Sequence, residues 1–128
     1  MSDIVGTWRL IRTRAHDDAG TPLPPPYGPK PSGIVVFQPD GRMITALCDG
    51  RPMMPDGEPR QFMSYAGNYL FDGKTLVTRV DASSDPSRVG GEQVRQARFE
   101  AGMLVLTPPL RLWGGVMQQH ELMWERIA

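Results

Sequence analysis

The sequence predicts an all-β fold, an eight-stranded antiparallel up-and-down barrel with one short helix. Two observations lead to this prediction. First, 13 prolines and 14 glycines lie between short runs of β-branched and aromatic residues, which is typical of strands that alternate with turns. Second, these runs number about eight, and most are joined by short turns, so that neighbours can pair as hairpins. Eight such strands can close into a ring, which removes both exposed edges of the sheet.

Length and charge limit the possible functions. With 128 residues the chain is long enough for one domain, residues 1–128, and too short for two. Fourteen basic residues balance 14 acidic ones, so the formal net charge is zero. Nucleic-acid binding depends on a strong positive field. We therefore expect no nucleic-acid partner.

The sequence also bears on the compartment. Cys48 is the single cysteine, so no disulfide can form within the chain. The first residues, MSDIVGTW, contain neither a basic segment nor a long apolar run. We expect a soluble, cytoplasmic protein with no membrane partner.

The first half of the chain is expected to form three strands. The first covers residues 5–15, and the second and third cover residues 33–38 and 42–48. The last two are joined at Pro39-Asp40-Gly41, because proline fixes φ and Asp-Gly supports a tight reversal. The segment TPLPPPYGPKP, residues 21–31, is too rich in proline for ladder hydrogen bonds, so we expect a stiff, polyproline-like connector.

The second half is expected to contain the helix and five strands. The helix is placed within residues 53–65, with Pro59 tolerated in its first turn, where it would cap one end of the barrel or flank its mouth. Reversals at Asp72-Gly73 and Ala101-Gly102 separate the next strands into two hairpins. The expected strands are residues 67–71, 75–83, 93–99, 103–107 and 116–127.

A set of short motifs runs through the chain. In order, they are Gly6-Thr7-Trp8, Tyr27-Gly28-x-x-Pro31-x-Gly33, Pro39-Asp40-Gly41-Arg42-Met43, Tyr65-x-Gly67-x-Tyr69-x-x-Asp72-Gly73, Ser84-x-Pro86, Gln93-x-Arg95 and Leu122-x-Trp124-Glu125-Arg126. By order and spacing, the set resembles the lipocalin-like domain family of bacteria and fungi, whose members are small stand-alone barrels. The resemblance spans nearly the whole chain and implies that the opening tryptophan packs beneath a basic residue from the chain's end. A few relatives are similar to cyclases of natural-product pathways, so the resemblance implies a fold more firmly than a function.

Period two along each strand predicts which side chains face the interior. If Trp8 faces inward, Trp8, Trp124 and Arg126 are expected to cluster at a closed end, where the guanidinium stacks on indole. The remaining inward positions are mostly apolar or small: Leu10, Ile34, Val36, Met43 or Ile44, Gly67, Phe71, Leu76, Val80, Ala97, Phe99, Leu104, Leu106 and Leu122.

Polar residues also fall on inward positions: Arg12, Arg95, Tyr69, Thr78 and His120. An ion that is buried without a partner is costly, so these groups must be either hydrated or paired. Two arginines that face one cavity favour a carboxylate, phenolate or enolate group. The alternative for Arg12 is that the first strand bends or ends early, so that Arg12 and Arg14 reach solvent.

Bulky apolar side chains lie in or beside the predicted connections: Tyr27, Met53, Met54, Phe62, Met63, Trp113 and Met117. They form a lid over a ligand, or they seal an end of the barrel, or they make a contact in a homodimer. We count Tyr27 and Trp113, together with the inward Phe99, among the candidate ligand-binding residues.

Two functions fit these predictions. The first is a small-molecule binding protein that holds a mostly apolar ligand with an anionic or carbonyl group, with Arg12 and Arg95 as anchors and Tyr69, Thr78 and His120 beside them. The second is a cofactor-free cyclase or isomerase of a polyketide-like or aromatic molecule, with His120 or Tyr69 as the catalytic group that moves a proton. We favour binding, because no acidic residue is expected inside. We expect no cofactor and no metal.

Overall fold

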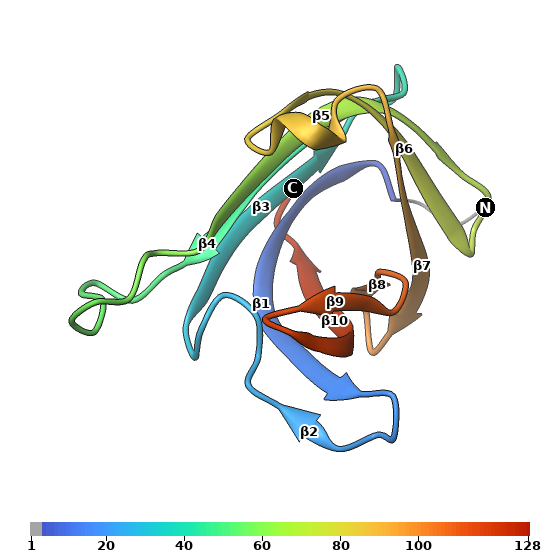
Figure 1. The fold of residues 1–128 in the computed structure, drawn as a ribbon. Helices are drawn as coiled ribbons and strands as arrows, with labels where there is room; N and C mark the ends of the chain where they lie inside the picture. The colour runs from blue at the N-terminus through green and yellow to red at the C-terminus, as the bar shows by residue number, and fades with distance from the viewer. Residues whose placement is uncertain (1–3) are drawn as a thin grey trace.

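The computed structural model describes residues 4–128, and Figure 1 shows its strands wrapped into a ring. Residues 1–3 of the predicted single domain lie outside the described residues. The elements are β1 (Gly6–Asp17), β2 (Pro22–Leu23), β3 (Pro31–Phe37), β4 (Arg42–Asp49), β5 (Phe62–Phe71), β6 (Thr75–Ser83), the 3-10 turn η1 (Pro86–Arg88), β7 (Glu92–Glu100), β8 (Met103–Thr107), β9 (Arg111–Trp113) and β10 (Val116–Arg126).

The predicted eight-stranded antiparallel barrel is confirmed. The strands follow the order β1-β3-β4-β5-β6-β7-β8-β10, and the pairing of β10 with β1 closes the ring. The two short strands β2 and β9 lie outside this ring, on β1 and β10 respectively. Within residues 4–128 there is no helix of the length and apolar character that a membrane crossing requires.

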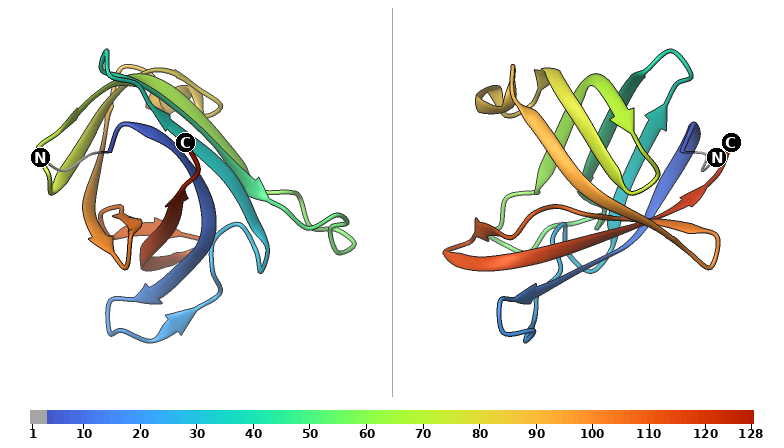
Figure 2. Two further views of the ribbon diagram at one scale, coloured as in Figure 1. Left: turned by 180° about the vertical axis from the view of Figure 1, so that it is seen from behind. Right: turned by 90° about the vertical axis from the view of Figure 1, so that its right-hand side faces the viewer.

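The two ends of the barrel differ (Figure 2). The β3–β4, β5–β6 and β7–β8 turns lie at the same end as the C-terminus. Each of these turns contains a glycine with positive φ: Gly41, Gly73 and Gly102. The β1–β2 hairpin and η1 lie at the other end, which we call the mouth. This difference follows from the sequence, because the short Asp-Gly and Ala-Gly turns join neighbouring strands at one end, and the longer connections join them at the other.

Aromatic side chains fill the end with the tight turns. Trp8 is buried, its indole N–H donates to the Ile4 carbonyl, and the Arg126 guanidinium lies 4.3 Å from the centre of its ring. Phe99 contacts both Trp8 and Phe71 at centroid distances of 6.2 and 6.3 Å. The predicted stacking of Arg126 on Trp8 is therefore confirmed, and this end is closed.

The predicted helix within residues 53–65 is wrong. Residues 50–61 form a loop that projects from the ring in Figure 1, and β5 begins at Phe62. Three prolines in eight residues, from Pro52 to Pro59, prevent a continuous helix. From Phe62 onward, side chains alternate with period two, so that Phe62 is exposed while Met63 and Tyr65 line the interior.

The connector over residues 21–31 also differs from the prediction. Pro22 and Leu23 pair with β1, and Pro31 begins β3, so ladder pairing extends into both ends of the proline-rich segment. Both positions are compatible with proline, because β2 is a two-residue edge strand and Pro31 is the first residue of its strand.

In β3, the inward face is the opposite of the predicted one. Val35 and Phe37 are buried in the core, whereas Ile34 is exposed and Val36 is only half-buried. Every residue from Ile34 to Phe37 is apolar, so no alternation of apolar and polar residues shows which side chains face inward. The register decides instead, because Trp8 pairs with Val35 and residues directly opposite share a face of the sheet.

Candidate ligand-binding cavity

A cavity opens at the mouth of the barrel and extends to Trp124 near its centre. The space in which the centre of a water molecule fits is about 50 Å³, and the empty space including the mouth is about 600 Å³. The smaller of these two volumes corresponds to roughly three to five water molecules. The lining residues are Tyr27, Val35, Phe37, Met43, Thr45, Leu47, Met63, Tyr65, Leu76, Arg88, Arg95, Leu106, Pro108, Arg111, His120, Leu122 and Trp124.

The charged part of the lining is entirely basic. Arg88, Arg95 and Arg111 line the cavity, and no aspartate or glutamate does. Arg88 of η1 has an ion pair with Asp85, at 3.4 Å. In the part of the chain that the structure describes, neither Arg95 nor Arg111 has an ion pair. The cavity therefore carries two positive charges that no carboxylate balances.

Arg95 projects from β7 and is held by neutral acceptors. Its Nη1 donates to the Val94 carbonyl at 2.9 Å, and its Nη2 donates to Gln93 Oε1 at 2.8 Å. The same Gln93 oxygen accepts from Arg88 Nη1 at 2.9 Å, so two guanidinium groups meet at one amide oxygen. Burial lowers the pKa of Arg95, and the nearby charge of Arg88 acts in the same direction.

Arg111 comes from β9, where it pairs with Gln118 of β10. Its guanidinium lies 5.0 Å from the centre of the Trp113 ring. Burial lowers the pKa of Arg111, and the charges of Arg95 and Arg88 lower it further. The three guanidinium groups line one cavity, where like charges oppose one another.

His120 lies on β10 and is fully buried. Its Nε2 is 3.1 Å from Gln118 Oε1, and the Gln118 amide nitrogen donates to the Trp113 carbonyl at 2.8 Å. This chain orients the Gln118 oxygen toward the imidazole, so Nε2 carries the hydrogen and Nδ1 is an acceptor. Burial, followed by the charges of Arg111 and Arg95, lowers the pKa of His120 from 6.5 to about 4. The imidazole is therefore neutral at pH 7.

Three buried side-chain atoms lack a hydrogen-bond partner within residues 4–128: Arg111 Nε, His120 Nδ1 and Trp124 Nε1. All three belong to residues that line the cavity. Buried polar atoms are nearly always paired in folded proteins, with protein groups, water or a ligand. Their common location gives the cavity three polar atoms with which a water molecule or a ligand can pair.

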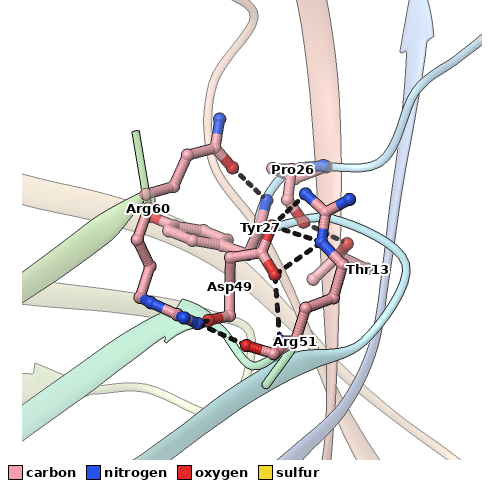
Figure 3. Close-up of polar contacts among 7 residues, drawn as sticks. Thr13, Pro26, Tyr27, Asp49, Arg51 and Arg60 are labelled. Carbon is pink, nitrogen blue, oxygen red and sulfur yellow. Dashed lines mark hydrogen bonds and ion pairs between the residues drawn. The ribbon is translucent and has the colours of Figure 1, made fainter. Parts of the chain in front are cut away.

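The residues between β2 and β3 form a strap over the mouth, which brings Tyr27 to the cavity. Tyr27 has a φ of 65°, in the left-handed region that costs a residue with a side chain roughly 1 kcal/mol or more. The strap is tied on both sides of this residue: Thr13 Oγ donates to the Pro26 carbonyl at 2.6 Å, and the Tyr27 N–H donates to Gln61 Oε1 at 2.5 Å (Figure 3). Burial raises the pKa of Tyr27.

Asp49, at the end of β4, supports the strap from below. It is 1% exposed, and Arg51 donates to it through Nε and Nη2, the latter at 2.6 Å (Figure 3). Arg60 crosses the loop and donates to the carbonyls of Asp49 and Arg51. Gly28 lies against Asp49 so closely that a Cβ there would be 2.3 Å from the carboxylate oxygen. The carboxylate therefore links the strap to the β4–β5 loop.

We expect Asp49→Asn to destabilise the protein at pH 7 and to have less effect at pH 3. The hydrogen bonds from Arg51 hold the pKa of Asp49 below its ordinary value of 3.8. Its contribution to stability is thus fully present above about 3.8 and is lost as the pH falls through the lower, folded-state value. Urea denaturation of both proteins at the two pH values measures the difference. Asp56→Asn, in the same loop and exposed, is the matched control. A difference that stays constant between pH 7 and pH 3 would contradict this role.

The structure brings some of the predicted site residues together. Arg95, His120 and Tyr27 line the cavity. Trp113 is not part of the lining but packs edge-on against two residues that are, at centroid distances of 4.9 Å from His120 and 6.2 Å from Tyr27. The roles of these residues toward a ligand stay predictions.

Arg12 is not in the cavity, and its predicted inward position is wrong. The ladder of β1 with β10 shifts between Leu10 and Arg12, which leaves Ile11 as an extra residue. A bulge of this kind reverses the alternation, so Trp8 and Leu10 face inward before it and Thr13 does after it. Arg12 is exposed on the outer face, where its Nη2 lies 3.1 Å from the Met123 sulfur.

Three further predicted residues lie away from the cavity lining. Tyr69 packs on Phe37 at 5.1 Å near the closed end and donates from its hydroxyl to the Gln38 carbonyl. Phe99 belongs to the aromatic cluster at the same end. Thr78 is inward and buried, but it lies within the wall of β6. The prediction that these three side chains face the interior was correct. It did not say how far along the barrel axis each of them lies.

Arg111, Arg88 and Tyr65 are cavity residues that the sequence analysis missed. The signal for Arg111 is Gly114-Gly115, because two consecutive glycines between apolar residues are typical of a tight hairpin. Both glycines have positive φ, 59° and 83°, and the hairpin pairs β9 with the start of β10. Tyr65 was assigned to the predicted helix. No local pattern distinguishes Arg88 from an ordinary loop residue.

No group of three or more histidine, cysteine, aspartate or glutamate side chains in residues 4–128 is arranged to hold a metal ion.

Comparison with known proteins gives one finding. A sequence model of a family described as a lipocalin-like domain matches residues 5–58 and 55–127, two overlapping segments that together span nearly the whole chain. No curated protein and no solved structure shows significant similarity to the chain.

Proposed function

Because the chain belongs to the lipocalin-like domain family, we propose that its barrel binds a small, mostly apolar molecule that carries an anionic group. The observation that supports this proposal is the composition of the cavity. Its walls are largely aliphatic and aromatic, while Arg95 and Arg111 face it with no carboxylate in the lining. Concave apolar sites with a few convergent polar groups are the usual form of small-molecule sites.

The arginines supply the anchor. A guanidinium that loses water without gaining an anion raises the free energy of the folded protein. An anionic ligand reverses this cost through charge-assisted hydrogen bonds, and the planar fork of arginine suits a carboxylate or phosphate. In this proposal, Arg111 replaces Arg12 as the second anchor beside Arg95, because Arg12 lies on the outer face.

The apolar walls limit the size and shape of the ligand. Val35, Leu76 and Leu106 are branched and buried, so they offer fixed surfaces. Met43 and Met63 also line the cavity, and methionine adapts its shape to a partner. The space open to the centre of a water molecule is only about 50 Å³, so a compact molecule such as a single aromatic ring fits best.

The same site favours binding over proton transfer. A general base works best when its pKa is near the operating pH, and the pKa of His120 is about 4. Tyr69, the other predicted catalytic group, hydrogen-bonds to Gln38 near the closed end. We therefore favour a binding protein over the cyclase or isomerase.

Calorimetric titration with benzoate and benzamide at pH 7 tests the proposal. The two probes have nearly the same shape, and only benzoate is charged. We expect benzoate to bind at least about ten-fold more tightly, because it alone balances the arginines. Failure of both probes to bind, or equal affinity for the two, would contradict an anion-binding cavity.

A further inference from the structure

We propose that the head group of the ligand carries two negative charges, as the phosphate of an aryl phosphate monoester does. This inference rests on the proposed function and specifies its ligand class. It depends on the number of unbalanced cations in the cavity, on their distance from one another, and on the hydrogen-bond donors that have no protein partner.

The residues that line the cavity determine how much positive charge a ligand must balance. Three guanidinium groups face the cavity, and Asp85 balances that of Arg88 at 3.4 Å. Arg95 and Arg111 have no ion pair among the described residues. His120 adds no charge, because burial and the charges of Arg111 and Arg95 lower the pKa of its imidazole to about 4. A ligand with one negative charge would leave one of the two cations unbalanced.

The cations are also held close together. Gln93 Oε1 accepts from Arg88 Nη1 at 2.9 Å and from Arg95 Nη2 at 2.8 Å. An amide oxygen can take two donors, but it carries no charge and cannot offset the repulsion between them. A dianion placed among Arg88, Arg95 and Arg111, which line one cavity, offsets this repulsion more fully than a monoanion.

The free donors match a head group with several oxygens. Arg111 Nε and Trp124 Nε1 are N–H groups that are buried without a partner within residues 4–128, and both residues line the cavity. A phosphate monoester presents three strong acceptor oxygens. Those oxygens can accept from unpaired N–H groups as well as from the two guanidinium forks.

The pH dependence of binding distinguishes a dianion from a monoanion. The second pKa of a phosphate monoester is about 6. The titratable groups around the head group are Arg95 of β7, Arg111 of β9, Arg88 of η1 with its partner Asp85, His120 of β10, Tyr65 of β5 and Tyr27 of the strap. Burial lowers the pKa of His120 to about 4, hydrogen bonds from Ser87 hold the pKa of Asp85 below its ordinary 3.8, and burial raises the pKa of Tyr27 above its ordinary 10. A change in affinity between pH 5 and pH 7.5 therefore reports on the ligand.

The experiment is calorimetric titration of phenyl phosphate and phenyl sulfate at pH 5 and pH 7.5. The two probes share a ring and a tetrahedral head group, and phenyl sulfate keeps a single charge throughout. We expect phenyl phosphate to bind about five- to ten-fold more tightly at pH 7.5 than at pH 5, because only about a tenth of it is dianionic at pH 5, and phenyl sulfate to change less than two-fold. Equal affinity for the two probes at pH 7.5 would overturn the inference and leave the proposed function intact.

A variant and a second probe complete the test. In Arg111→Gln, which removes one cation, we expect phenyl phosphate to lose its advantage over phenyl sulfate at pH 7.5; an unchanged advantage would overturn the inference. Inorganic phosphate should bind at least ten-fold more weakly than phenyl phosphate, because it lacks the ring. If neither phenyl probe nor benzoate binds, the proposed function fails as well.

Discussion

Replacement of Arg95 by methionine is expected to weaken the binding of phenyl phosphate by about 30-fold or more, which corresponds to ~2 kcal/mol. The same variant is expected to be more stable than the wild type when no ligand is present. Folding removes the Arg95 guanidinium from water and gives it only neutral hydrogen-bond acceptors. This burial lowers the pKa of Arg95. Methionine fills a similar volume without a charge, so we expect ~1 kcal/mol of added stability, or a few degrees in Tm. Calorimetry and thermal unfolding measure the two effects.

Arg12→Met is the matched control for this prediction. The substitution is the same, the residue also lies on a strand of the ring, and its guanidinium contacts only the Met123 sulfur on the outer face among the contacts that the structure records. We expect the affinity for phenyl phosphate to be unchanged. Weak binding in Arg12→Met together with normal binding in Arg95→Met would show that the assignment of the anchors is wrong.

Replacement of Gly67 by alanine is expected to lower the free energy of unfolding by about 3 kcal/mol or more. Gly67 lies on β5 beside an irregularity in the pairing with β6. A Cβ at this position would be 1.9 Å from the Arg79 carbonyl oxygen and 3.1 Å from the Val80 Cα. Both are backbone atoms, so the strands themselves would have to move apart. Urea denaturation measures the loss.

Gly91→Ala is the control for Gly67→Ala. Gly91 is exposed, its φ is not in the left-handed region, and the nearest atom to a new Cβ is the Arg88 oxygen at 3.4 Å. We expect the free energy of unfolding to change by less than about 0.5 kcal/mol. Similar losses in the two variants would mean that close approach of the backbone at Gly67 is not the cause.

The strand order could be predicted because it depends on local turns. The reversals at Gly41, Gly73 and Gly102 were expected from Asp-Gly and Ala-Gly, and all three glycines adopt the positive φ that such turns require. Each turn fixes the pairing of the two strands beside it, and eight paired strands leave two edges that close on each other. The motifs quoted above, spread over nearly the whole chain, indicated the same fold.

The candidate site was predicted only in part, because it depends on where separate strands meet. Arg95 and His120 were expected inside, since their strands alternate regularly. Arg12 was expected beside them, and the extra residue at Ile11 turned it outward. A single residue added to one strand changes the face of every residue that follows, and the sequence of β1 shows no sign of it.

The amino-acid sequence by itself determined the architecture of this protein: the barrel, its hairpins and the stacking of Arg126 on Trp8. Those features follow from short-range rules of turns and alternation. Only the tertiary structure decided which cations share the cavity, because Arg88, Arg95 and Arg111 come from three different elements and meet through pairings distant in sequence. It also decided the position of Tyr27, whose left-handed conformation is held by Thr13 and Gln61 on either side of the mouth. Contacts of this kind arise only when the ring closes.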